Sequence, residues 1–127
     1  MSFLNAIFGT ASKVDSKELQ EEFAAILMEG EEITGAFKIV RDLMVFTPYR
    51  VILADKQGLS GKKVEYRSIP YKSITQFSVE TAGHFEMDAE LNIWISSNPV
   101  PLKKEFRKGT DIIAVQKLLA SHLFKNP

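Results

Sequence analysis

The fold of this chain is decided by residues 41–80, which read RDLMVFTPYRVILADKQGLSGKKVEYRSIPYKSITQFSVE. This stretch contains short runs that are apolar throughout or that alternate between apolar and polar residues. The runs are Leu43 to Thr47, Arg50 to Ala54, Lys62 to Ile69, and Ile74 to Glu80. Proline and glycine separate them, and Gly58 and Gly61 indicate a hairpin that needs positive φ. Strand-length runs punctuated in this way predict an antiparallel meander.

Three more strands are predicted outside this stretch. They cover residues 33–39, 90–96 and 100–107, the last with Leu102 and Phe106 on its inner face. Alternating polarity places one face of a strand on a core and the other toward water. The run from Leu43 to Phe46 is apolar on both faces, so another element must cover its outer side. Residues 2–13 and a helix at 16–29 are the candidates for that cover.

Two helices flank the predicted strands. Residues 15–30 begin with the outline of a capping box, Asp15 and Glu18, and Gly30 supplies a left-handed stop. The apolar stripe of this helix consists of Leu19, Phe23, Ile26 and Leu27. A C-terminal helix follows Gly109, with Thr110 or Asp111 as its cap. Its stripe consists of Ile112, Val115, Leu119 and Leu123, broadened by Leu118.

Residues 2–13 predict a short arm with its own apolar side. Phe3, Leu4, Ile7 and Phe8 share one side of a helix that Gly9 would end. The arm either folds back on its own core or docks on a neighbouring subunit. A helix lying on a membrane would carry Lys or Arg along its polar face, and residues 2–12 have none. We therefore do not expect membrane-surface contact.

Seven short strands followed by one amphipathic helix predict a mainly β fold with helices. A seven-stranded sheet has exposed edges unless it curls, and one helix can plug the end of a small barrel. We expect a bent antiparallel sheet, or partly open barrel, capped by the C-terminal helix. The chain of 127 residues is then a single domain. It divides into an N-terminal helical arm (1–31), a β-barrel (32–108) and a capping helix (109–125).

The composition excludes several classes of protein. Sixteen basic and sixteen acidic residues give a formal net charge of zero, so no overall field favours nucleic acid or an anionic membrane. The chain has no cysteine, which excludes disulfides and thiolate metal sites and fits the reducing cytoplasm. No apolar run approaches the about 20 residues that span a bilayer, and no signal peptide is evident.

The sequence offers little for catalysis or for holding a cofactor. The only histidines are His84 and His122. His122 lies beside apolar positions of the last helix, which indicates a packing or surface role. His84 has Glu86 and Asp88 nearby, but zinc sites usually draw ligands from separated segments, so an ordinary loop is the favoured interpretation. With no phosphate-binding glycine motif, we expect no enzyme, cofactor or metal site.

Two charged segments of opposite sign remain. Residues 15–32 are strongly acidic, and residues 103–108 are basic, with Lys103, Lys104 and Arg107 among them. Such small basic patches on a neutral chain make a weak case for nucleic acid. Each segment is a solvated face by default. The two could also meet across a head-to-tail contact between copies, which closes into a ring when its rotation allows.

The whole chain resembles the bacterial pleckstrin-homology-like (PH-like) domain proteins. The resemblance is carried by ADKQGLSGKKVEY and IPYKSITQFSVETAGHF, by the start FLNAIFGTASKVD and by the tail KKEFRKGTDIIAVQKLLASHLF. It implies a seven-stranded, strongly bent sheet capped by the C-terminal helix, ring-shaped homo-oligomers, and an undefined biochemical role. Lipid-binding PH domains hold phosphoinositides beside the first hairpin. The matching link here, 40–43, is tight and sets Arg41 beside Asp42, so we expect no such binding.

Self-association is therefore the leading functional hypothesis, and another protein is a further possible partner. Aromatic residues dominate interface energetics, so the candidate interface residues are Phe3, Phe8, Phe85, Trp94, Lys103, Lys104 and Arg107. The aromatic ones could instead pack inside their own chain. An alternative hypothesis is a small-ligand or lipid-headgroup binder that uses the concave sheet face or the 81–88 loop. A third, hydrolysis, would need a pocket that brings His84 to a nucleophile.

Overall fold

The computed structural model describes residues 16–39, 42–57, 63–84 and 87–124. Seven strands form two antiparallel sheets, of order β1-β2-β3-β4 and β5-β6-β7. The elements in chain order are α2 (Ser16–Phe23), β1 (Gly35–Ile39), β2 (Asp42–Phe46), β3 (Arg50–Gln57), β4 (Lys63–Pro70), the 3₁₀ turn η1 (Tyr71–Ser73), β5 (Ile74–Thr81), β6 (Ala89–Ile95), β7 (Leu102–Phe106) and α3 (Ile112–Phe124). The predicted mainly β fold, partly open and capped by a C-terminal helix, is confirmed.

Side chains alternate between the two faces of β2, so this one strand contributes to two hydrophobic clusters. Met44 and Phe46 belong to an inner cluster that both sheets share with α3. Leu43 and Val45, on the opposite face, belong to an outer cluster. That outer cluster is completed by Leu19 and Phe23 of α2, by Ile33 and Ala36, and by Ile52 and Ala54 of β3. The expectation that another element covers this apolar face is confirmed for α2; the other candidate, residues 2–13, lies outside the described residues.

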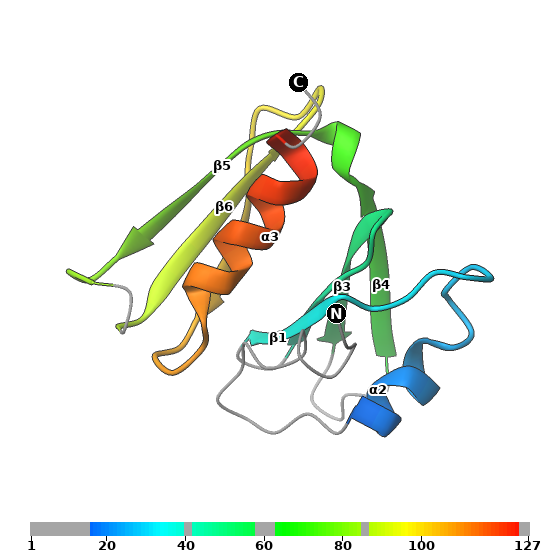
Figure 1. Cartoon of the computed structure of the whole chain (residues 1–127). Helices are drawn as coiled ribbons and strands as arrows, with labels where there is room; N and C mark the ends of the chain where they lie inside the picture. Colours follow the sequence, from blue (N-terminus) through cyan, green and yellow to red (C-terminus); the bar gives the residue numbers. More distant parts are fainter. Residues whose placement is uncertain (1–15, 40–41, 58–62, 85–86, 125–127) are drawn as a thin grey trace.

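Helix α3 fills the space between the two sheets (Figure 1). Its predicted stripe is confirmed, since Ile112, Val115 and Leu119 are buried in the inner cluster. Asp111 is the cap, because its Oδ1 accepts a hydrogen bond of 3.0 Å from the Ala114 N–H. Within the described residues, no helix has the length and apolarity needed to cross a membrane.

The predicted helix at 15–30 is wrong in its extent, because α2 ends at Phe23. The Phe23 carbonyl accepts hydrogen bonds from both Ile26 N (2.9 Å) and Leu27 N (3.0 Å), and the chain then turns. The Ile26 carbonyl accepts a hydrogen bond of 2.8 Å from Arg50 Nη2 instead of continuing a helix. Gly30 has the expected positive φ, +82°, but it serves a turn beyond the helix.

The docking of α2 depends on one aromatic side chain. Phe23 is 0% exposed, and its ring meets Tyr66 of β4 edge-to-face with centroids 5.6 Å apart. We expect Phe23→Ala to lower the free energy of unfolding by about 3–5 kcal/mol, the usual cost of removing a buried phenyl ring. Urea unfolding followed by circular dichroism measures this.

Met28→Ala is the matched control for this substitution. Met28 is 53% exposed in the adjoining segment, so its truncation should change stability by no more than about 0.5 kcal/mol. Equal urea midpoints for Phe23→Ala and the wild type would show that α2 contributes nothing to the fold.

Candidate interaction surface

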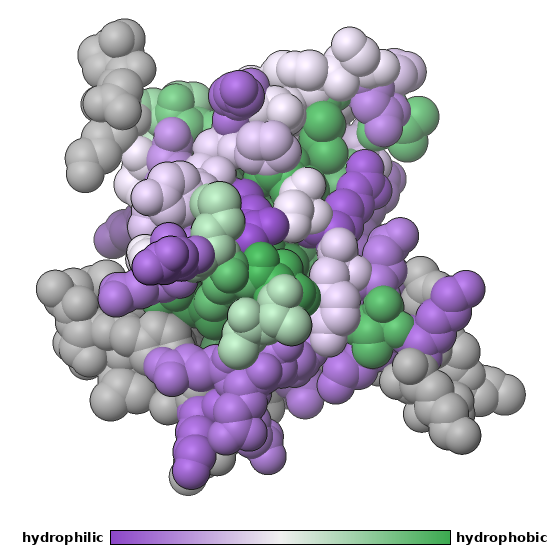
Figure 2. Space-filling view, turned by 90° about the vertical axis from the view of Figure 1, so that its right-hand side faces the viewer, coloured by the Kyte–Doolittle hydropathy of each residue, from purple (hydrophilic) through white to green (hydrophobic). Residues whose placement is uncertain are grey.

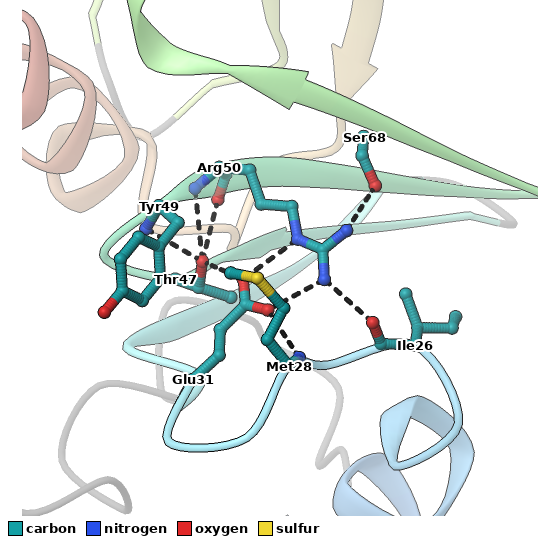
Figure 3. A network of polar contacts seen from close by, with 7 residues as sticks. All are labelled: Ile26, Met28, Glu31, Thr47, Tyr49, Arg50 and Ser68. Atoms are coloured by element: carbon teal, nitrogen blue, oxygen red, sulfur yellow. Dashed lines mark hydrogen bonds and ion pairs between the residues drawn. The ribbon is translucent and has the colours of Figure 1, made fainter.

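An ion pair between a buried carboxylate and a partly buried arginine joins the segment after α2 to the first sheet (Figure 3). Glu31, which is 5% exposed, lies before β1, and Arg50 begins β3. Arg50 Nη2 is 2.7 Å from Glu31 Oε1, and Arg50 Nε donates to Oε2 at 2.9 Å. Two parallel charge-assisted hydrogen bonds make this a geometrically specific contact. The pair therefore fixes where residues 24–33 lie on the sheet.

The remaining hydrogen-bonding capacity of Glu31 is also used. Thr47 Oγ1 donates to Oε2 at 2.7 Å, and the Met28 N–H donates to Oε1 at 2.9 Å. Arg50 Nη1 donates to Ser68 Oγ at 2.9 Å, which ties in β4. A buried carboxylate is tolerated when its lone pairs are satisfied in this way. This network therefore holds structure together and offers no free acid or base to a substrate.

The charge state of the pair follows from these contacts. The hydrogen bonds from Arg50, helped by those from Met28 and Thr47, together lower the pKa of the Glu31 carboxyl from 4.5 to about 2 against the opposing effect of burial. The hydrogen bond to Glu31 raises the pKa of Arg50 in turn. At neutral pH both groups are ionised.

The same network reaches helix α3 through Tyr71. The buried Tyr71 hydroxyl donates to the Thr47 carbonyl oxygen at 2.6 Å, and burial raises the pKa of Tyr71 well above its ordinary value. Its ring stacks on that of His122 in α3, with centroids 4.1 Å apart and planes 10° from parallel. The predicted packing role of His122 is confirmed.

Residues 16–34 present an acidic surface with a cavity of mixed polar and apolar lining. We define the acidic surface by the exposed carboxylates Glu18, Glu21, Glu29 and Glu32. The cavity, about 310 Å³, is lined by Gln20, Ala24, Leu27, Glu31, Glu32 and Ile33. Figure 2 shows hydrophobic side chains gathered in the middle of the face toward β4 and α2, among hydrophilic ones. The sequence prediction counted Glu31 in the outer acidic face, and that placement is wrong because Glu31 is internal.

The predicted basic segment is split between two ends of β7. Lys103 is exposed and Lys104 half-buried near its start. Arg107, at the other end, lines a cleft of about 570 Å³ together with Glu80, Asp88, Glu90 and Glu105. The structure therefore places Arg107 among carboxylates and apart from Lys103 and Lys104.

The aromatic candidates have different outcomes. Trp94 is half-buried on β6 opposite Gln76. Phe3, Phe8 and Phe85 lie outside the described residues. Val100, which was not among the predicted interface residues, is the most exposed large apolar side chain in the described part, at 68%. Its position between Pro99 and Pro101 was the available signal.

The described residues of the 81–88 loop form neither a metal site nor a phosphate site. Within the residues that the structure describes, no cluster of three or more His, Cys, Asp or Glu side chains could hold a metal ion. His84 is exposed, Glu86 lies outside those residues, and Asp88 Oδ1 accepts a hydrogen bond of 2.7 Å from the Lys108 N–H. The four carboxylates of the neighbouring cleft would repel a phosphate group.

The ion pair predicts a specific loss of stability in acid. The folded-state pKa of Glu31, about 2, lies below its ordinary 4.5. The pair therefore stabilises the fold fully above about pH 4.5 and loses this contribution as the pH falls toward 2. We expect Glu31→Gln to remove about 3 kcal/mol of the decline in unfolding free energy over that range. Urea unfolding at a series of pH values measures it.

Glu32→Gln is the control for the acid experiment. Glu32 is exposed and takes no part in the network of Figure 3, so its variant should keep the wild-type dependence on pH. A Glu31→Gln variant that also keeps it would refute the role of the pair.

Comparison with known proteins agrees with this architecture. The family model for the bacterial PH domain matches residues 2–123. An uncharacterised Bacillus subtilis protein, YjqA, is 54% identical over 122 residues, covering 95% of this chain and 98% of its own length. A crystal structure of a pleckstrin homology domain from Shewanella amazonensis is 54% identical, with a TM-score of 0.78, covering 97% of this chain and 99% of that one.

A second solved structure gives the same result. A Shewanella loihica protein with a pleckstrin-homology domain is 50% identical, with a TM-score of 0.78, covering 91% of this chain and 99% of its own. The match of the family model, residues 2–123, includes all seven strands, the segment that carries Glu31 and all but the last residue of the capping helix. The chain belongs to the bacterial PH domain family.

Proposed function

We propose that this PH-like domain is a non-enzymatic interaction module of the cytoplasm that associates with copies of itself into ring-shaped homo-oligomers. The observation that carries the proposal is the separation of charge along the molecule. Residues 16–34 contain six glutamates and a single base, Lys17. Residues 66–79 and 91–104 contain no acid, and their bases are Arg67, Lys72, Lys103 and Lys104.

The segments without acids come together in the fold. Ile74 pairs with Ile95, and the Ser96 N–H donates to the Ser73 carbonyl oxygen at 2.8 Å. This basic end of the molecule, which includes η1 and the loop after β6, lies opposite the end that carries α2 (Figure 1). Opposite charges at opposite ends favour a head-to-tail contact, which generates a ring when its rotation closes.

The titratable groups support a non-catalytic role. The carboxyl of Glu31 and the hydroxyl of Tyr71 have strongly shifted pKa values, a feature that often marks an active site. The Glu31 carboxylate, however, accepts a hydrogen bond from Arg50, and the Tyr71 hydroxyl donates one to the Thr47 carbonyl oxygen. Their perturbation therefore has a structural explanation.

Light scattering on a gel-filtration column tests self-association. We expect a mass that is a multiple of 14.3 kDa. Raising the salt from about 0.01 M to 1 M shortens the Debye length from about 30 Å to about 3 Å, so it should shift the eluted species toward the monomer. A monomer at every protein concentration and in low salt would refute the proposal.

Sedimentation with liposomes separates this function from lipid-headgroup binding. We expect the protein to remain in the supernatant with vesicles of anionic phospholipid, as it does with neutral vesicles. The reason is that four carboxylates line the cleft beside the 81–88 loop. Salt-sensitive pelleting with anionic vesicles alone would favour the lipid-binding alternative.

A further inference from the structure

The loop between β6 and β7 carries one exposed apolar side chain. Val100 is 68% exposed, and its N–H donates to Asn98 Oδ1 at 3.1 Å. Pro99 and Pro101 restrict the backbone on either side. Ser97 has a positive φ of +66°, which is uncommon outside glycine and asparagine. Strained backbone of this kind persists where the surrounding structure enforces it, often at binding sites.

Residues 91–104, which include this loop, carry positive charge and no acid. Lys103 is exposed three residues away on β7. Lys72 is exposed on η1, next to the Ser73 carbonyl oxygen that binds the Ser96 N–H. Because residues 91–104 contain no carboxylate, these lysines are not neutralised from within the loop. The loop thus presents an apolar tip with a basic surround.

The cavity beside α2 has the complementary character. Ala24, Leu27 and Ile33 supply apolar wall, and its volume of about 310 Å³ lies at the lower end of ligand-binding pockets. Glu32, a residue of its rim, is exposed, as is Glu29 nearby. The Glu31 carboxylate in the wall is neutralised by Arg50. An occupant should therefore bring an apolar side chain with positive charge around it.

We propose that Val100 of one copy inserts into the α2 cavity of the next copy. Lys72 and Lys103 of the first copy then face Glu29 and Glu32 of the second. This inference rests on the proposed self-association and identifies its contact. A second copy is favoured as the occupant because its own loop supplies both the apolar tip and the complementary charge. Since the contact joins different surfaces, it repeats from copy to copy.

Disulfide trapping tests this contact directly, because the chain contains no cysteine. Ala24 is exposed and lines the cavity, so Ala24→Cys and Val100→Cys leave the buried core unchanged. Disulfides need Cα atoms about 4.4–6.8 Å apart. We expect the double variant, under mild oxidation, to give a ladder of linked multimers on a non-reducing gel. Each single variant should give at most a dimer.

The matched control pairs Ala24→Cys with Ile113→Cys. Ile113 is another exposed apolar residue, 43% exposed, but it lies on α3 and outside the proposed contact. This pair should give no ladder. A ladder as strong as that of the Val100 pair would overturn the proposal, since it would show random collision.

The dissociation constant of the assembly tests the Val100 contact separately from self-association itself. We expect Val100→Asp to weaken assembly at least about tenfold by sedimentation velocity, as for a central anchor, and Ile113→Asp to leave it unchanged. A wild type that assembles, with Val100→Asp assembling equally well, refutes the contact and leaves self-association standing. If deletion of residues 2–13 abolishes that assembly, the N-terminal arm is the occupant. A monomeric wild type refutes both.

Discussion

The pairing of Glu31 with Arg50 is the interaction on which the outer half of the molecule depends. Removing two charges from water costs several kcal/mol per ion, and the cost is recovered only with good geometry and satisfied hydrogen bonds. Here both oxygens of Glu31 receive bonds from Arg50, and Thr47 and Met28 complete the set. The pair therefore determines the course of residues 24–33. That course closes the outer cluster over β2, a strand that would otherwise expose an apolar face.

The sequence predicted most of the architecture because the periodicities are local. The strands and the stripe of α3 follow from residues two, three or four positions apart. The end of α2 could not be predicted in the same way. The Ile26 carbonyl is claimed by Arg50, a residue 24 positions further along the chain, and no local pattern reveals this. The charge of Glu31 was misplaced for the same reason, since its partner lies 19 positions away.

The candidate surface was predicted less well than the fold. Residues 103–108 are basic in sequence, but an extended strand advances about 3.3 Å per residue. It therefore carries Lys103 and Arg107 to opposite ends of β7, where their neighbours differ. In the fold, Lys72 and Lys103 belong to the same basic end of the molecule, although they are far apart in the sequence. Val100 was overlooked because a lone exposed valine is usually without significance. The two flanking prolines and the absence of acids in residues 91–104 distinguish this one.

The hydrogen-bond network around Glu31 also bears on how the α2 cavity could bind a partner. A surface binds a partner more tightly when less conformational freedom is lost on contact. The turn at Thr47 binds Glu31 by its hydroxyl and Tyr71 by its carbonyl oxygen, and Tyr71 stacks on His122. The walls of the α2 cavity are thereby tied through β2 and β3 to the capping helix. The Glu31 carboxylate is neutralised within that wall, so the cavity can accept an apolar side chain. The exposed carboxylate of Glu32 lies at its rim, where the proposed contact brings a partner's lysine.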